Sequence, residues 1–147
     1  MEEKIWQDAR GEAMDKEFKG KYRILGSDND PKCVSLSFAN AKKAGISDCV
    51  TFADGDATKM SLPADGGILI CNPPYGQRLM EQDSARRLYS ALGRHLKFAN
   101  NWQKFIITSE PEFEHYFGKR ADKKRKLYNG MIKCDYFMYT NTQRKKV

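Results

Sequence analysis

Apolar and polar positions follow one another along the chain in a way that predicts alternating strands and helices. Four short apolar runs have the length of buried strands: residues 22–26, 50–52, 68–71 and 104–108. The segments after the first and third runs repeat their apolar side chains every three or four residues, which is the spacing of amphipathic helices, whereas residues 60–67 are expected to form a loop with a possible short turn. Strands that alternate with helices are typical of a mostly parallel sheet.

The first two helices have recognisable end signals. Residues 1–19 carry charges between apolar positions and predict a helix that uses Trp6 as a packing anchor and ends near Gly20. Asp30 can cap the next helix, and Gly45 marks its end. A strand, an acidic turn and a helix therefore follow in the order of a βαβ unit.

The two later helices are predicted in the same way. A helix capped by Asp83 or Ser84 presents four apolar side chains on one face: Ala85, Leu88, Leu92 and Leu96. Ser109 and Glu112 form a capping-box pair before a shorter helix. Every predicted helix thus has one face to bury against a sheet.

The C-terminal part changes character. Asn129-Gly130 is a strong hairpin signal, and the segments 126–128 and 131–133 flank it as strand residues, with the second arm continuing to Tyr139. An antiparallel hairpin after four strand–helix alternations predicts an α/β fold with a mostly parallel sheet and an antiparallel edge. Residues 1–147 contain no linker or repeat, so one domain is expected.

Composition narrows the functional classes. The 147 residues include 40% hydrophobic and 31% charged side chains, and no apolar run approaches the roughly 20 residues that span a bilayer. The four cysteines are far apart and form no C-x-x-C pair: Cys33, Cys49, Cys71 and Cys134. We therefore expect no metal site, and reduced core thiols in a cytoplasmic protein.

Positive charge is concentrated in the C-terminal third. The net charge is +7, and one segment holds seven basic residues against the single acid Asp122: Lys119, Arg120, Lys123, Lys124, Arg125, Lys126 and Lys133. Such a patch favours binding to a polyanion, although a solvated face of a basic protein is the alternative.

The segment Asn72-Pro73-Pro74-Tyr75 carries the most specific chemistry. It follows the apolar run 68–71, and ligands of open α/β sheets bind at the carboxyl ends of strands. The Asn72 amide oxygen and the Pro73 carbonyl can accept hydrogen bonds from a planar amino group and turn its lone pair outward. The two prolines stiffen the turn, and Tyr75 offers a face on which a base can stack. This pattern indicates alkylation of an exocyclic amine.

Acidic residues follow two other strands. Asp28 comes after residues 22–26, where a carboxylate can hold ribose hydroxyls. Asp56-Ala57 follows the next strand and can accept from an adenine amino group. Each acid alone is as consistent with a turn.

Together these motifs resemble a known family. They are Gly-Ser-Asp-x-Asp-Pro from Gly26, Asn40-Ala41-x-x-Ala44-Gly45, Asp56-Ala57, Asn72-Pro73-Pro74-Tyr75-Gly76-x-Arg78 and Arg125-Lys126-Leu127-Tyr128-Asn129-Gly130. The chain resembles the S-adenosylmethionine-dependent RNA methylases that often carry a THUMP domain, in particular bacterial guanine-N2 methyltransferases of large-subunit ribosomal RNA. That resemblance covers about residues 1–140.

The resemblance implies specific roles. Asp28 with Asn29 would hold the cofactor ribose, Asp56 with Ala57 its adenine, and Asn72 to Tyr75 the target amine, with Asn72 also facing the cofactor. The cofactor would be S-adenosylmethionine and the partner ribosomal RNA. Four further residues are candidate RNA contacts: Arg78, Arg125, Lys126 and Asn129.

One departure from the family concerns the sheet. The first strand of the Rossmann-like methyltransferase sheet and its glycine-rich cofactor loop have no counterpart in the sequence. In the family's sheet order, 3-2-1-4-5-7-6, that strand would lie between the strands at Ile24 and Ile68. We therefore expect residues 1–147 to be the C-terminal portion of a catalytic domain, inactive alone. The gap would be closed by direct pairing, by a missing segment or by self-association.

Three alternatives remain open at this stage. The same turn suits adenine N6 in DNA or a glutamine amide in a protein, because all these groups are planar. The third alternative is a non-catalytic nucleic-acid-binding module. His95 and His115 stand alone and are expected to have surface or capping roles.

Overall fold

Two structural units make up the chain in the computed structural model, which describes residues 2–17, 20, 23–76 and 79–140. The first unit spans Met1–Asp54 and the second Gly55–Val147. The elements of the first unit are α1 (Glu2–Asp15), β1 (Ile24–Asp28), α2 (Pro31–Lys43) and β2 (Val50–Asp54). The elements of the second are β3 (Gly67–Cys71), α3 (Leu79–Leu96), β4 (Trp102–Thr108), α4 (Phe113–Phe117), β5 (Lys123–Asn129) and β6 (Ile132–Tyr139).

The first unit is built on two parallel strands. β1 pairs with β2 in a register that sets Asp28 opposite Asp54 at their carboxyl ends. Helix α2 packs on this pair, with the rings of Phe38 and Phe52 edge to face at 5.2 Å. The Asp30 carboxylate accepts the Lys32 N–H at the start of α2, so the predicted helix cap is confirmed.

Helix α1 is shorter than predicted and its apolar face is uncovered. It ends at Asp15, and Trp6 is 68% exposed. The interpretation of Trp6 as a buried packing anchor is therefore wrong. An amphipathic pattern predicts a helix and an apolar face, but it does not specify what covers that face.

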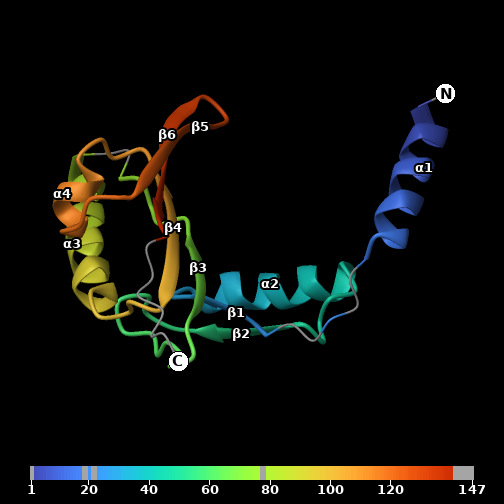
Figure 1. Cartoon of the computed structure of the whole chain (residues 1–147), viewed down its shortest axis with the longest axis horizontal. Helices are drawn as coiled ribbons and strands as arrows, with labels where there is room; N and C mark the ends of the chain where they lie inside the picture. The colour runs from blue at the N-terminus through green and yellow to red at the C-terminus, as the bar shows by residue number, and fades with distance from the viewer. Residues whose placement is uncertain (1, 18–19, 21–22, 77–78, 141–147) are drawn as a thin grey trace. The chain divides into compact units, whose positions relative to one another are not determined.

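A four-stranded mixed sheet organises the second unit, in the order β3-β4-β6-β5. β3 and β4 are parallel, and β6 runs antiparallel to both of its neighbours (Figure 1). The predicted mixed sheet with an antiparallel C-terminal hairpin is therefore present. Within the described residues the strands form two separate sheets, β1-β2 in the first unit and β3-β4-β6-β5 in the second.

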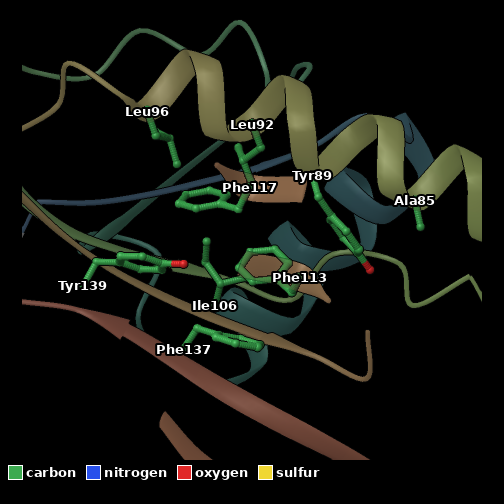
Figure 2. Packing of buried hydrophobic residues seen from close by; sticks show 9 residues of the cluster. All are labelled: Ala85, Tyr89, Leu92, Leu96, Ile106, Phe113, Phe117, Phe137 and Tyr139. Atoms are coloured by element: carbon green, nitrogen blue, oxygen red, sulfur yellow. The ribbon is translucent and has the colours of Figure 1, made fainter. Parts of the chain in front are cut away.

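The core of the second unit lies between the sheet and two helices. Figure 2 shows α3 side chains above the rings of Phe113, Phe117 and Phe137. The helices approach closely at Gly93, where a Cβ atom would lie 1.9 Å from the Phe117 carbonyl oxygen, so only glycine fits. The buried side chains of this cluster are Ala85, Tyr89, Leu92, Leu96, Ile106, Phe113, Phe117, Phe137 and Tyr139.

Two helix starts differ from their predictions. α3 begins at Leu79, so Asp83 and Ser84 lie inside the helix and not at its cap; both side chains are exposed, which makes a polar residue tolerable there. The expected capping box before α4 is also wrong, because the Glu110 carboxylate accepts the Glu112 N–H and the cap position Glu112 makes no side-chain cap bond.

The cysteines are free thiols, and only Cys134 is buried. The expectation that all four are core thiols is therefore wrong for Cys33, which is exposed, and for Cys49 and Cys71, which are half-buried. Each lies next to or within a regular element whose solvent-facing side could not be identified from the spacing of apolar residues alone.

Candidate active site

The turn Asn72–Tyr75 follows β3 and folds back on itself. Asn72 is exposed, Pro73 is buried and Tyr75 is half-buried. The Tyr75 hydroxyl donates to the Asn72 Oδ1 atom at 2.8 Å. Because a hydroxyl donates to the amide oxygen and not to the NH₂ group, this bond sets which side of the Asn72 amide is the acceptor.

A buried tyrosine holds the turn from the core side. The hydroxyl of Tyr89, on α3, donates to the Pro74 carbonyl at 2.7 Å and lies 3.0 Å from the Thr108 hydroxyl at the end of β4. Since Tyr89 has one hydroxyl proton, Thr108 is the donor in the second bond. The Glu110 N–H donates in turn to Thr108 Oγ1 at 3.2 Å. Burial raises the pKa of the Tyr89 hydroxyl, which therefore remains a donor.

The hydrogen bonds from Thr108 to Tyr89 and from Tyr89 to the Pro74 carbonyl, which we call the hydroxyl relay, fix the direction of the turn. The ring of Pro74 fixes its φ. The hydrogen bond to the Pro74 carbonyl restrains its ψ, which is the main backbone rotation that the ring leaves open. Consecutive hydrogen bonds also polarise one another in a dry interior. The Pro73 carbonyl, the second expected acceptor, is thus part of a backbone segment that follows β3 and is held by Tyr89 of α3, whose hydroxyl is bonded to Thr108 of β4.

The C-terminal hairpin reaches the same turn. Asn129 pairs with Ile132, so the two loop residues are Gly130 and Met131, with Gly130 at φ 61°. A glycine at the first loop position is typical of a type II′ turn. The Asn129 Nδ2 group donates to the Tyr75 hydroxyl at 3.4 Å. The structure therefore brings Asn72, Tyr75 and Asn129 together.

The hairpin was predicted correctly, but its register was not. Asn129 belongs to strand β5, whereas the sequence placed Asn129-Gly130 in the loop. The reason is that a Gly-x loop closes a two-residue hairpin as readily as Asn-Gly does. The shift by one residue gives Asn129 a ladder position and leaves Met131 at the tip.

Asp56 is held by its own loop. Its Oδ1 atom accepts the Thr58 hydroxyl at 2.7 Å and the Thr58 N–H at 2.8 Å, and Lys59 lies 3.3 Å from Oδ2. These contacts, led by the Thr58 hydroxyl, lower the pKa of Asp56, so it stays an anionic acceptor at neutral pH. Ala57 beside it is half-buried.

Asp28 lies at the end of β1 in the first unit. Its Oδ1 atom accepts the Asp30 N–H at 2.9 Å, and Asp28 and Asn29 are both exposed. Like Asp56, it is an exposed carboxylate fixed by a neighbouring main-chain N–H. Each carboxylate, taken by itself, can accept hydrogen bonds from the hydroxyl or amino groups of a nucleoside, which is the chemistry that the adenosyl group of S-adenosylmethionine requires.

The basic arm of the hairpin is exposed along its length. Arg125 and Lys126 are exposed, whereas Lys124 forms an ion pair with Glu114 at 2.9 Å and lies over the Phe137 ring. Arg78, the fourth candidate RNA contact, lies outside the described residues.

Other expectations concern metals, membranes and histidines. In the part of the chain that the structure describes, no three His, Cys, Asp or Glu side chains gather as a metal site. None of the helices described there is long and apolar enough to cross a membrane. His95 contacts the Met60 carbonyl at 2.8 Å, which is a structural role.

Comparisons with known proteins identify the family of the chain. A family model for the RMKL-like methyltransferase domain matches residues 2–137. The chain belongs to this family. YpsC of Bacillus subtilis (strain 168) is 34% identical over 146 residues, which cover 97% of this chain and 38% of YpsC. The ribosomal RNA large subunit methyltransferase K/L of Shewanella pealeana is 36% identical, covering 96% of this chain and 21% of that protein.

Solved structures of similar proteins share the fold. A "possible methylase" of Clostridium difficile 630 is 41% identical with a TM-score of 0.87, and the match covers 98% of this chain and 38% of that one. SMU.472, crystallised in complex with SAH, is 35% identical with a TM-score of 0.86, covering 95% and 37%. The predicted methyltransferase fold is therefore confirmed, and the chain spans 21% to 38% of these proteins.

Sequence reasoning missed two residues that support the turn in this RMKL-like domain. Tyr89 and Thr108 are fully buried. The buried stripe of α3 is Ala85, Tyr89, Leu92 and Leu96, whereas the prediction used Leu88, which is half-buried. The spacing of four, three and four residues was visible in the sequence. A polar tyrosine on that stripe was the available signal, because a buried hydroxyl needs a partner.

Proposed function

We propose that this chain is the part of an S-adenosylmethionine-dependent methyltransferase that holds the target amine. The substrate is an exocyclic amino group of RNA, guanine N2 of large-subunit ribosomal RNA in particular. The observation that carries the proposal is the oriented Asn72 amide oxygen on a turn bonded to the core. The name of the K/L relatives supports the choice of substrate.

The turn would activate the amine by positioning it. An amide oxygen has two lone pairs, so Asn72 Oδ1 can keep the Tyr75 hydroxyl bond and accept an N–H of the target. The Pro73 carbonyl would accept the second N–H, which directs the nitrogen lone pair away from the turn. Positioning of this kind supplies most of the rate in such reactions. The Tyr75 ring would stack on the base, worth about 1–3 kcal/mol.

The acids would hold the methyl donor. S-adenosylmethionine, when bound, supplies an electrophilic methyl group. Asp28 with Asn29 would accept from the ribose hydroxyls, and Asp56 with Ala57 would bind the adenine edge. The lowered pKa of Asp56 keeps this acceptor charged at neutral pH.

RNA contacts would come from the hairpin. Arg125 and Lys126 are exposed and can bind phosphates, as Arg78 can. Asn129 would act near the base, because its amide bonds to the Tyr75 hydroxyl. A ribosomal RNA substrate would place the protein in the cytoplasm.

The test replaces the amine acceptor. In the full-length protein, Asn72→Ala should lower methyl transfer to unmethylated ribosomal RNA on the order of 10²-fold, because one directed acceptor is lost. Asn100→Ala, which removes another exposed asparagine of the second unit, should leave the rate unchanged. Undiminished transfer by Asn72→Ala would falsify the role of Asn72.

The same assay separates the alternative substrates. Labelled S-adenosylmethionine is supplied with RNA, DNA and protein in one mixture, and the fractions are then counted. Label in RNA supports the proposal, whereas label confined to DNA or protein contradicts it. Calorimetry with S-adenosylmethionine on the same protein tests the cofactor, and absence of binding would favour a non-catalytic RNA-binding module.

A further inference from the structure

The tip of the β5–β6 hairpin exposes three apolar side chains. Met131 is 98% exposed, Tyr128 72% and Leu127 39%, and we call these three residues the tip patch. Met131 lies in the two-residue turn and Tyr128 near the end of β5, at the tip of the hairpin whose backbone Figure 1 shows. Polar residues are the usual occupants of such a turn, so apolar ones point to a partner.

The surroundings of the tip patch indicate a nucleic acid. Residues 123–133 contain five basic side chains and no acidic one. Lys124 forms an ion pair with Glu114. The other four cationic side chains are exposed, three on β5 and one on β6: Lys123, Arg125, Lys126 and Lys133. Apolar and aromatic groups between cations match the faces of bases between phosphates. Lysines on an edge strand can also serve to prevent pairing with another sheet. That explanation would account for the charges of β5 but not for the apolar side chains at the tip.

The tip patch lies next to a residue that is hydrogen-bonded to the turn Asn72–Tyr75, which we call the amine-holding turn. Asn129 lies between Tyr128 and the two loop residues, and its amide donates to the Tyr75 hydroxyl. Where Tyr75 stacks on a target base, the tip therefore lies beside the neighbouring nucleotides. The register of the hairpin contributes to this bond. It makes Asn129 the last paired residue of β5, whereas a loop position would leave Asn129 without a strand partner.

We propose that the tip patch inserts between stacked bases next to the target nucleotide of a base-paired RNA. The inference rests on the proposed function and names its substrate form. An amine inside a helix reaches an enzyme only if its nucleotide leaves the stack. Apolar side chains such as methionine occupy base steps that are opened in this way. Met131 and Tyr128 fill the vacated space, while Arg125 and Lys126 bind the adjacent phosphates.

The experiment uses the full-length protein and an RNA hairpin centred on the guanine that the protein methylates in ribosomal RNA. That guanine is located by mass spectrometry of RNA fragments. Methylation is measured on the hairpin that keeps the guanine, and fluorescence on a second hairpin in which it is replaced by 2-aminopurine, whose fluorescence rises when it leaves the stack. Met131→Ala and Tyr128→Ser are compared with Met14→Ala, which removes a methionine that is 73% exposed on α1. An unpaired strand with the same guanine serves as the second substrate.

The wild-type protein and Met14→Ala should raise the fluorescence of the paired hairpin severalfold. The two tip variants should lose most of that rise and methylate the paired hairpin about 10-fold more slowly, with less than about a twofold change on the unpaired strand. Tip variants that keep the full rise overturn the proposal, as does equal slowing on both RNAs. If the wild-type protein methylates no RNA, the proposed function itself fails.

Discussion

The turn Asn72–Tyr75 and the carboxylates of Asp28 and Asp56 are built in different ways. The turn is hydrogen-bonded to two other elements, through Tyr89 on α3 and Asn129 on β5, and the Tyr89 hydroxyl is bonded in turn to Thr108 at the end of β4. Asp28 and Asp56 are instead held by residues two positions further along the chain. The turn therefore depends on tertiary packing, whereas each acid depends on its own loop.

The largest expected effect comes from removing the core beneath the turn. Phe113 is fully buried and its ring packs on Tyr89 at 5.1 Å. Phe113→Ala should lower the free energy of unfolding by about 3–5 kcal/mol, measured by urea denaturation. Phe98→Ala in the same unit removes an exposed ring and should change it by less than about 0.5 kcal/mol. Similar losses for both variants would contradict this account of the core.

A smaller effect isolates the hydroxyl relay. Tyr89→Phe keeps the ring and removes the donor to the Pro74 carbonyl, which should cost about 1–2 kcal/mol of stability. Tyr139→Phe is the matched control, since the buried Tyr139 hydroxyl donates to the Lys119 carbonyl at 3.0 Å.

Both tyrosine variants should lower the melting temperature by a similar amount. Only Tyr89→Phe should speed amide hydrogen exchange at Tyr75 and Gly76, followed by NMR, because only its bond reaches the turn. Equal exchange rates in the two variants would mean that Tyr89 contributes stability and does not position the turn.

The smallest effect concerns Asp56. Its pKa is lowered, first by the Thr58 hydroxyl, so its folded-state pKa lies below the ordinary value of 3.8. The carboxylate therefore stabilises its loop at pH above 3.8, and this contribution is lost as the pH falls through the lowered pKa. Thr58→Val should move the pKa back up and Thr58→Ser should keep it low, as measured by carboxyl ¹³C titration. An unchanged pKa in Thr58→Val would show that the hydroxyl is not the cause.

Local features of the fold could be predicted from the sequence. Asp30 caps α2 and Gly45 follows its end with positive φ, because capping and left-handed turns depend on a few adjacent residues. The turn at Asn72–Tyr75 was predicted for the same reason, since the end of an apolar run and two prolines are local signals, and its chemical role stays a prediction.

Features that depend on tertiary contacts could not be predicted in this way. The bond from Tyr89 to Pro74 joins residues 15 positions apart, and the one from Asn129 to Tyr75 joins residues 54 apart. Trp6 is exposed although its pattern is that of a core residue. The hairpin loop moved by one residue because two turn types compete for the same short segment.

The bond between Tyr89 and the Pro74 carbonyl also determines how the turn responds to heat. Its donor lies within the most buried cluster of the second unit, so the turn cannot detach without disturbing that cluster. Segments linked in this way open together with the global transition and not by fraying. We therefore expect the turn Asn72–Tyr75 to open together with the sheet and its helices, and to keep its shape up to the temperature at which that unit melts.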